Sequence, residues 1–343
     1  MQLTNEQNHA IEEILKFKKD MVTLGGYAGT GKTTLISHLA QILPTFAVCA
    51  FTGKAANVLR RKGIAHASTI HSLIYTPYQD INGNVYFSLA EFLDCEGIIV
   101  DEASMVSQEI HDDLLYFGKP VIFVGDHGQL EPVGDKFNLM EKPDYILETI
   151  HRNAGEIAHF AEFIRKGYRP AAWEHQSLGN KVEFIHPRSY KKAIHEVDQV
   201  ICAFNKTRVE INIEARKQLG RKGIQPVAND RIMCLRNNSR VGLFNGMQGV
   251  VESVDDNRLT FAANDEMFYD LTYDPGVFHQ AKPYFDYDGP HPFDFCWAIT
   301  CHKAQGDEWP KGLVLEQKCD LWEHSRWAYT AASRFKEGIV WAA

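Results

Sequence analysis

Short apolar runs alternate with amphipathic stretches over most of the chain, and this alternation sets the first expectation about the fold. Apolar runs bounded by turn residues predict buried strands, and stretches with apolar residues every three or four positions predict helices. Strands and helices in alternation are typical of βα units around a parallel sheet. In the first half of the chain the predicted strands are residues 21–26, 45–51, 97–102 and 120–126.

The second half of the chain follows the same alternation, but it is interrupted. A strand at 199–204 precedes a helix at about 206–219, and the α/β pattern resumes at 294–300. In between, short alternating strands separated by turn residues predict a small antiparallel barrel or sandwich. The fold class is therefore α/β, with two parallel-sheet domains and an all-β insertion in the second.

These patterns also predict domain boundaries. An Asn-Gly pair at 82–83 lies between two stretches of strand-forming residues, which favours a tight hairpin turn within the first domain. The predicted first domain covers 1–147 with a hairpin at about 76–90, the second is formed by 148–228 and 293–343, and the β insertion covers 229–292.

Composition narrows the class of protein. The 343 residues contain 36 lysines and arginines against 44 aspartates and glutamates, a formal charge of −8. This balance argues against coating of nucleic acid through bulk positive charge, but leaves room for a local basic groove. Seven cysteines occur without a C-x-x-C pair, so we expect free thiols. The polar N-terminus and the lack of a membrane-length apolar run predict a soluble intracellular protein.

A phosphate-binding loop is the strongest chemical signal. Residues 26–33 match the pattern G-x-x-x-x-G-K-[ST] between a predicted strand and a predicted helix. In such a loop the backbone N–H groups face phosphate oxygens, the lysine reaches the β- and γ-phosphates, and the last hydroxyl binds Mg²⁺. The predicted nucleotide-binding residues are Gly26, Tyr27, Ala28, Gly29, Thr30, Gly31, Lys32, Thr33 and Thr34.

The strand at 97–102 ends in two carboxylates that complete this site. We expect Asp101 to hold Mg²⁺ together with Thr33, and Glu102 to orient or deprotonate the attacking water. The sequence thus predicts an ATP hydrolysis site that uses Mg²⁺. A nucleotide-binding switch or a small-molecule kinase would share the same loop, so further motifs have to decide between these classes.

Those further motifs resemble superfamily 1 helicases of the RecD and Dda type, in the order in which that family carries them. The resemblance implies that Gln7 reads adenine and that Gln129 senses the γ-phosphate. It also implies that Arg152 and Arg334 reach that phosphate from the second domain. From the residues alone, Gln7 belongs to a helix start and Arg334 is a cation at a helix end. The matching segments are 3–7, 50–56, 68–71, 124–133, 149–153, 300–306 and 329–334.

Three of these segments resemble the family's contacts with single-stranded DNA. Hydroxyl and ammonium groups can bind phosphates, and aromatic rings can stack on bases. From the residues alone, helix N-caps and a solvated lysine remain alternatives for the first two segments, and a surface loop for the third. The resemblance assigns DNA contacts to Phe51, Thr52, Lys54, Thr69, His71, Thr300, His302 and Lys303, and places Gln305 and Gly306 toward the nucleotide.

The resemblance implies a monomer of two RecA-like P-loop domains, with the hairpin as a strand-separating pin and the β insertion as an SH3-like barrel. The implied activity is ATP-dependent, 5′ to 3′ movement on single-stranded DNA, with unwinding at duplex junctions and ATP and Mg²⁺ as cofactors. Replication or single-strand-binding proteins are candidate partners, in a bacterial or phage-infected cytosol. Replication, recombination and repair all remain open, as do a plain surface hairpin and a passive β spacer. An ATP-gated binding module and a protein-displacing translocase are the alternative functions.

Overall fold

The protein folds into two compact units, Met1–Ala154 and Gly155–Ala343. Arg152 of the segment 149–153 and the predicted hairpin turn at 80–84 lie outside the described residues. Within the described part of the chain, no helix is long and apolar enough to cross a membrane. The computed structural model describes residues 3–16, 18–79, 85–131, 137–150, 155–175, 179–238, 243–263, 268–284, 286, 289–320 and 322–343.

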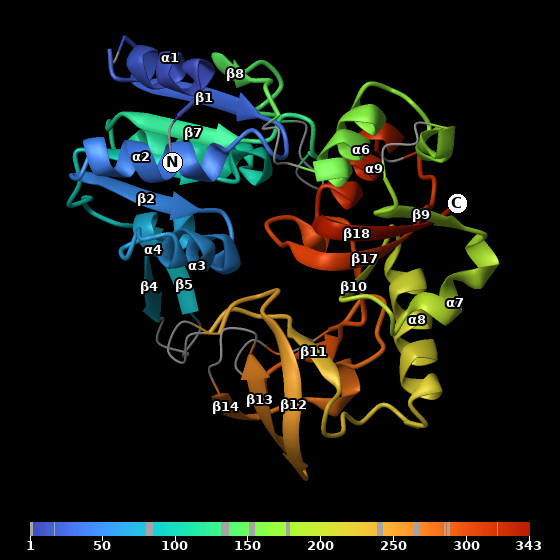
Figure 1. The fold of residues 1–343 in the computed structure, drawn as a ribbon. Helices are drawn as coiled ribbons and strands as arrows, with labels where there is room; N and C mark the ends of the chain where they lie inside the picture. Colours follow the sequence, from blue (N-terminus) through green and yellow to red (C-terminus); the bar gives the residue numbers. More distant parts are fainter. Residues whose placement is uncertain are drawn as a thin grey trace. The chain divides into compact units, whose positions relative to one another are not determined.

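Unit 1 is built on a six-stranded parallel sheet, drawn in blue and green in Figure 1. The strand that precedes the phosphate-binding loop, β1, lies between β7 and β8. Loops that follow neighbouring parallel strands emerge at the same edge of the sheet, so the residues after β1, β6 and β7 are brought close together. The strand order is β3 (Ser68–Thr69), β2 (Phe46–Ala50), β6 (Gly97–Asp101), β7 (Val121–Gly125), β1 (Met21–Gly26) and β8 (Tyr145–Leu147).

Helices cover both faces of this sheet, because alternate residues of each strand bury on opposite sides. Ile99 and Val124 pack in one core with helices α1, α2 and α3. Val100 and Phe123 pack in a second core with α4 and α5. The helices are α1 (Asn5–Ile14), α2 (Lys32–Ile42), α3 (Gly53–Arg61), α4 (Ile70–Ile74) and α5 (Gln108–Tyr116).

A two-stranded antiparallel hairpin follows α4. Its strands β4 (Tyr75–Gln79) and β5 (Val85–Leu89) pair in register, and they occupy the segment for which the sequence predicts a hairpin. Tyr78 is 52% exposed and Phe87 is 64% exposed. The hairpin therefore carries exposed aromatic surface, and its role as a pin remains a prediction.

Unit 2 contains a second parallel sheet, covered on one face by α6 and α9 and on the other by α7 and α8 (Figure 1). The RecA-like α/β fold predicted from the sequence is thus confirmed. The strands are, in order, β16 (Ala298–Thr300), β10 (Gln199–Cys202), β17 (Trp309–Leu315), β18 (Phe335–Ala342) and β9 (Val182–Ile185), and the helices are α6 (Gly155–Arg165), α7 (Tyr190–Ala193), α8 (Asn205–Gln218) and α9 (His324–Ala332).

Unit 2 also contains a five-stranded antiparallel sheet in the region of the predicted β insertion. Its inner face packs into the same hydrophobic core as one face of the parallel sheet, with Phe261 and Phe293 beside Val200 and Leu313. The two sheets therefore share one continuous core. The strand order is β14 (Phe268–Thr272), β13 (Arg258–Ala263), β12 (Gln248–Asp255), β11 (Arg231–Cys234) and β15 (Phe293–Phe295).

The apolar run predicted as one strand at 294–300 is divided between these two sheets. β15 pairs with β11 of the antiparallel sheet, and β16 pairs with β10 of the parallel sheet. Asn212 of α8 stabilises the break: its Nδ2 donates to the carbonyl of Phe295 at 2.7 Å, and its Oδ1 accepts from the N–H of Ala298 at 2.8 Å. A side chain distant in sequence thus satisfies the backbone groups that a continuous strand would have paired.

We expect the cysteines to differ sharply in reactivity. Burial raises the pKa of Cys202 to about 12 and of Cys234 to about 11, and it also raises the pKa of Cys49 and Cys301. Because the thiolate is the reactive form, these thiols stay inert in the native protein even at mildly alkaline pH. Titration with a thiol reagent should label at most Cys95 and Cys319 before unfolding, and all seven cysteines afterwards. Native labelling of a third thiol would contradict this packing.

Candidate functional site

The phosphate-binding loop connects β1 to α2. Gly29 and Gly31 have φ angles of 81° and 82°, a left-handed region that glycine adopts without steric cost. A Cβ at Gly26 would lie 2.7 Å from a side-chain oxygen of the same loop, so any larger residue would collide there. Lys32 Nζ turns back toward the loop and donates to the carbonyls of Gly26 at 2.6 Å and Tyr27 at 3.0 Å. Such a loop can present its backbone N–H groups to phosphate oxygens.

Asp126, directly after β7, is a site residue for which the sequence patterns predict no role. Its carboxylate lies 3.8 Å from Lys32 Nζ and accepts from Gln129 Nε2 at 3.2 Å and from the N–H of Gly128 at 2.9 Å. Asp126 is buried. It therefore links the lysine of the phosphate-binding loop to the predicted γ-phosphate sensor. One sequence signal could have identified Asp126: the predicted strand 120–126 is apolar and ends in a carboxylate, as the strand 97–102 does.

The two carboxylates after β6 are in different environments. Burial, and to a smaller extent the charge of Glu102, raises the pKa of Asp101 to about 7, while Lys32 opposes this shift. Asp101 Oδ1 accepts the N–H of Glu102 at 2.8 Å, and Glu102 has a φ of 54°. A non-glycine residue in the left-handed region is strained, and such strain concentrates at functional sites.

These groups fit a divalent cation beside a nucleotide. A buried carboxylate whose charged form is penalised is stabilised by a cation, and Mg²⁺ takes oxygen ligands such as a carboxylate and a hydroxyl. Asp101 ends β6 and Thr33 lies in the first turn of α2, next to Thr34, while Ala28 lies in the loop itself.

Gln7 is buried and its amide is engaged within unit 1. The side chain completes a capping box at the start of α1, where its Oε1 accepts the N–H of Thr4 at 2.9 Å. Its Nε2 donates to the carbonyl of Thr30 at 3.0 Å, inside the phosphate-binding loop. The helix start that the residues alone indicate is thus observed, and it is joined to the loop by a hydrogen bond that no local pattern predicts. The adenine-reading role of Gln7 remains a prediction.

The predicted DNA contacts of unit 1 lie at two helix starts. Thr52 caps α3 by accepting the N–H of Ala55 at 3.1 Å, and Thr69 caps α4 by accepting the N–H of Ser72 at 3.1 Å. Phe51 is half-buried against the core formed with α4 and α5. The N-cap alternative is therefore observed for both threonines. It is compatible with phosphate binding, because helix N-termini attract anions. Lys54 lies in the first turn of α3, and His71 is exposed on α4.

The segment 300–306, which resembles the helicase motif V and is called motif V below, begins at the end of β16. Thr300 is buried at the strand end, and His302 and Lys303 lie in the 3₁₀ turn η6 (His302–Ala304). Lys303 Nζ donates to Asn245 Oδ1 at 2.7 Å, so this turn is joined to the segment that precedes β12. Gln305 is buried, and Gly306 has a φ of 78°.

Arg334 follows α9 and is buried within unit 2. Its guanidinium donates to the carbonyl of Thr330 at 3.2 Å, to Ser333 Oγ at 2.9 Å and to the carbonyl of Asp307 at 3.4 Å. The interaction with its own helix end agrees with the reading from the residues alone. The contact with Asp307, just after motif V, also links two of the segments that resemble the helicase family, 300–306 and 329–334. Its action on a γ-phosphate remains a prediction.

Comparison with known protein families identifies the class of fold around the phosphate-binding loop. Residues 2–186, more than half of the chain, match the model of a family described as an AAA domain. The chain belongs to this AAA domain family. The matched region contains the phosphate-binding loop and the residues after β6 and β7, so the family assignment rests on the segment that carries the predicted ATP site.

Individual relatives of this AAA protein confirm the resemblance to RecD and Dda. It is 26% identical over 370 residues to the ATP-dependent RecD2 DNA helicase of Deinococcus radiodurans, covering 98% of this chain and 48% of that protein. It is 34% identical over 145 residues to the ATP-dependent DNA helicase dda of Enterobacteria phage T4, covering 38% of this chain and 33% of that protein. The chain thus spans about half of RecD2 and a third of Dda.

Among solved structures, a Pif1 helicase from Bacteroides in complex with ADP-AlF3 and ssDNA has a TM-score of 0.67 and 22% identity to the AAA protein. The alignment covers 100% of this chain and 93% of that chain. Because the two sequences are only 22% identical, this structural similarity supports the fold of the chain and nothing more.

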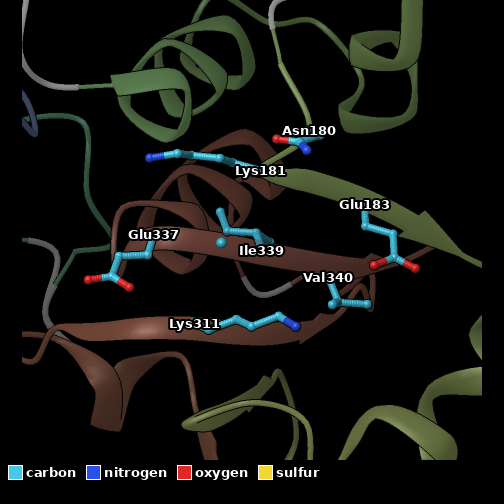
Figure 2. Close-up of a pocket in the computed structure, with 8 residues that line it drawn as sticks. Asn180, Lys181, Glu183, Lys311, Glu337, Ile339 and Val340 are labelled. Atoms are coloured by element: carbon cyan, nitrogen blue, oxygen red, sulfur yellow. The ribbon is translucent and has the colours of Figure 1, made fainter.

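A pocket of about 290 Å³ lies elsewhere on unit 2 and is shown in Figure 2. Lys181 and Glu183 line it from the start of β9, and Lys311 and Glu337 from the first halves of β17 and β18. Ligands of parallel α/β sheets bind outside the carboxyl ends of the strands, where motif V lies. This pocket lies toward the amino ends and its charges are mixed, so it is not the functional site.

We expect Asp126→Asn to slow hydrolysis without unfolding the AAA protein. An asparagine can still accept from Gly128, but it removes the negative charge beside Lys32. The kcat of the predicted ATP hydrolysis should fall by about tenfold or more, because the lysine and Gln129, the predicted γ-phosphate sensor, lose a shared anchor. Steady-state kinetics would show the loss in kcat rather than KM. An unchanged kcat with an unchanged thermal transition would contradict the role of Asp126.

Proposed function

We propose that the chain is an ATP-dependent helicase that moves along single-stranded DNA and separates duplexes. The observation that carries the proposal is the link from Lys32 of the phosphate-binding loop through Asp126 to Gln129. A motor protein requires a connection between its phosphate-binding loop and a γ-phosphate sensor. Through this connection, binding and hydrolysis of ATP can change the positions of residues outside the loop. The printed names of RecD2 and Dda, both ATP-dependent DNA helicases, support the same function.

The proposed chemistry assigns one task to each group of unit 1. Lys32 and the loop N–H groups bind the phosphates of ATP, and Glu102 orients the attacking water. Thr33 and Asp101 hold Mg²⁺, which when bound neutralises charge on the phosphates. Gln129 responds to the γ-phosphate, and Gln7 recognises adenine.

Two arginines complete the proposed groups of the ATPase. Arg334 of unit 2, and Arg152 near the end of unit 1 in sequence, stabilise the charge that develops during phosphoryl transfer. The end of motif V, at Gln305 and Gly306, faces the nucleotide. Arginines that reach a phosphate only in one arrangement of the protein couple hydrolysis to movement.

The proposed DNA path combines hydroxyl and ammonium groups with aromatic rings, a combination typical of single-strand binding. The support is that Thr52 and Thr69 start helices, and that Lys303 lies in the turn after β16. From the resemblance to RecD and Dda we further propose that movement runs 5′ to 3′. In the same proposal the exposed hairpin acts as a strand-separating pin, and the antiparallel sheet forms an SH3-like module. The proposed path is formed by Phe51, Thr52, Lys54, Thr69, His71, Thr300, His302 and Lys303.

Duplexes with a 5′ or a 3′ single-stranded tail test this function directly. With ATP and Mg²⁺, we expect strand release from the 5′-tailed duplex only, and hydrolysis that single-stranded DNA stimulates. Release from the 3′-tailed duplex alone would reverse the polarity. Hydrolysis without release from either duplex would contradict the helicase and favour an ATP-gated binding module or a protein-displacing translocase. The same duplexes with RNA strands show whether a 2′-hydroxyl is tolerated.

A further inference from the structure

Three aromatic side chains of unit 2 follow the carboxyl ends of three neighbouring parallel strands. His302 follows β16, Phe204 follows β10, and Trp322 lies in the connection that follows β17. These strands are adjacent in the order β16, β10, β17. The carboxyl ends of parallel strands are where α/β sheets bind their ligands. The position of the three residues in the fold is therefore that of a binding site.

The three rings form a continuous row. The ring centroid of Trp322 lies 6.0 Å from that of Phe204, with an interplanar angle of 37°, and 5.3 Å from that of His302, with an angle of 71°. Phe204 is 36% exposed, although it is a large apolar side chain at a strand end. We call Phe204, Trp322 and His302 the aromatic row. Burial lowers the pKa of His302, which favours the neutral form of its ring.

The loop that carries Phe204 is held in place. Gln317, just after β17, accepts the N–H of Ala203 with its Oε1 at 3.0 Å and donates from its Nε2 to Thr207 Oγ1 at 2.9 Å. One side chain thus bridges the residues on both sides of Phe204 and fixes them to the connection that leads to Trp322. A surface aromatic ring on a fixed loop binds a flat ligand with little loss of conformational entropy.

Two lysines lie close to the row in sequence. Lys206 is exposed in the first turn of α8, two residues after Phe204, and Lys303 follows His302, with its ammonium donating to Asn245 Oδ1 at 2.7 Å. The carboxylate of Glu323, adjacent in sequence to Trp322, forms an ion pair with Arg326, with 3.3 Å between Oε2 and Nε. The negative charge next to Trp322 is therefore balanced by a cation. Aromatic rings flanked by cations are the combination that binds unpaired nucleotides, since bases stack on the rings while phosphates meet the cations.

We propose that the aromatic row is a base-stacking site for unpaired nucleotides of single-stranded DNA, with Phe204 offering its exposed ring to a base. The proposal rests on the proposed function and extends it to Phe204 and Trp322, two residues that lie in none of the motifs resembling the helicase family. Stacking needs no particular base, because every base has a flat aromatic face. The site therefore suits a protein that moves along a strand without regard to sequence.

The experiment compares two fluorescein-labelled strands of equal length, an oligothymidylate and a strand of abasic sites, at one salt concentration. Both strands present the same phosphates, but only the first presents bases. Phe204→Ala should weaken binding of oligothymidylate between about fivefold and a hundredfold, and should leave the weaker binding of the abasic strand unchanged. Phe204→Tyr should restore the affinity. Phe268→Ala, which removes a 67% exposed ring from β14 of the same unit, is the matched control and should bind as the unsubstituted protein does.

Two results would overturn the stacking site while leaving the proposed function intact. One is equal affinity of Phe204→Ala and unsubstituted protein for oligothymidylate, and the other is an equal loss on both strands, which would indicate a damaged fold or phosphate site. Unsubstituted protein that fails to bind oligothymidylate, and whose hydrolysis single-stranded DNA does not stimulate, would overturn the proposed function itself. The unsubstituted protein therefore distinguishes the two failures.

Discussion

Lys32→Ala should reduce the proposed DNA-stimulated ATP hydrolysis by at least about a hundredfold. The ammonium of Lys32 is the positive charge of the phosphate-binding loop, and its position is fixed by the carbonyls of Gly26 and Tyr27 and by Asp126. Alanine removes that charge and leaves the buried carboxylate of Asp126 without its cationic neighbour. Hydrolysis measured by phosphate release, and strand release from the 5′-tailed duplex, should fall together.

Lys18→Ala is the matched control for this substitution. Lys18 is a lysine of the same unit, 67% exposed and paired with Glu13 at 3.4 Å, so its loss should leave hydrolysis unchanged. Thermal unfolding of both variants checks that unit 1 remains folded. A Lys32→Ala protein that kept more than about a tenth of the original rate would contradict the assigned ATP site.

The fold class and the phosphate-binding loop could be predicted because their signals are local. A buried strand, a glycine loop and a helix follow one another within residues 21–42, and each is recognisable by its own pattern. The role of Asp126, in contrast, could not be predicted from local patterns. Its importance depends on β7 pairing with β1, which brings the end of one strand beside the loop that follows the other. Sequence shows that both strands exist, but not that they are neighbours.

The same limit explains the error at 294–300. The segment has the periodicity of a single buried strand, and nothing within it marks the division between β15 and β16. The division depends on Asn212, whose amide binds the backbone on both sides of the break. Very short strands such as β3 and β8 were also beyond local prediction, since two or three residues carry too little periodicity.

Asp230→Ala should destabilise unit 2 by about 3–5 kcal/mol. The carboxylate of Asp230 is fully buried before β11, where it accepts from Arg216 at 3.1 and 3.3 Å, from Arg221 at 2.6 Å and from the N–H of Val227 at 2.8 Å. Alanine leaves the guanidinium of Arg216, itself buried and 4.1 Å above the ring of Phe295, without its anion. An unpaired buried charge costs far more than the loss of a pair at the surface.

Tryptophan fluorescence measures this effect selectively, because all six tryptophans, from Trp173 to Trp341, lie in unit 2. Asp270→Ala breaks the exposed pair with Arg258 in the antiparallel sheet, where the two side chains are 61% and 56% exposed. This matched control should cost about 1 kcal/mol or less. Urea unfolding of Asp230→Ala should remain one transition, since both sheets of unit 2 share a core. A loss no larger than that of Asp270→Ala, or separate transitions for the two sheets, would contradict the view that Arg216 and Asp230 join the antiparallel sheet to the parallel sheet of unit 2.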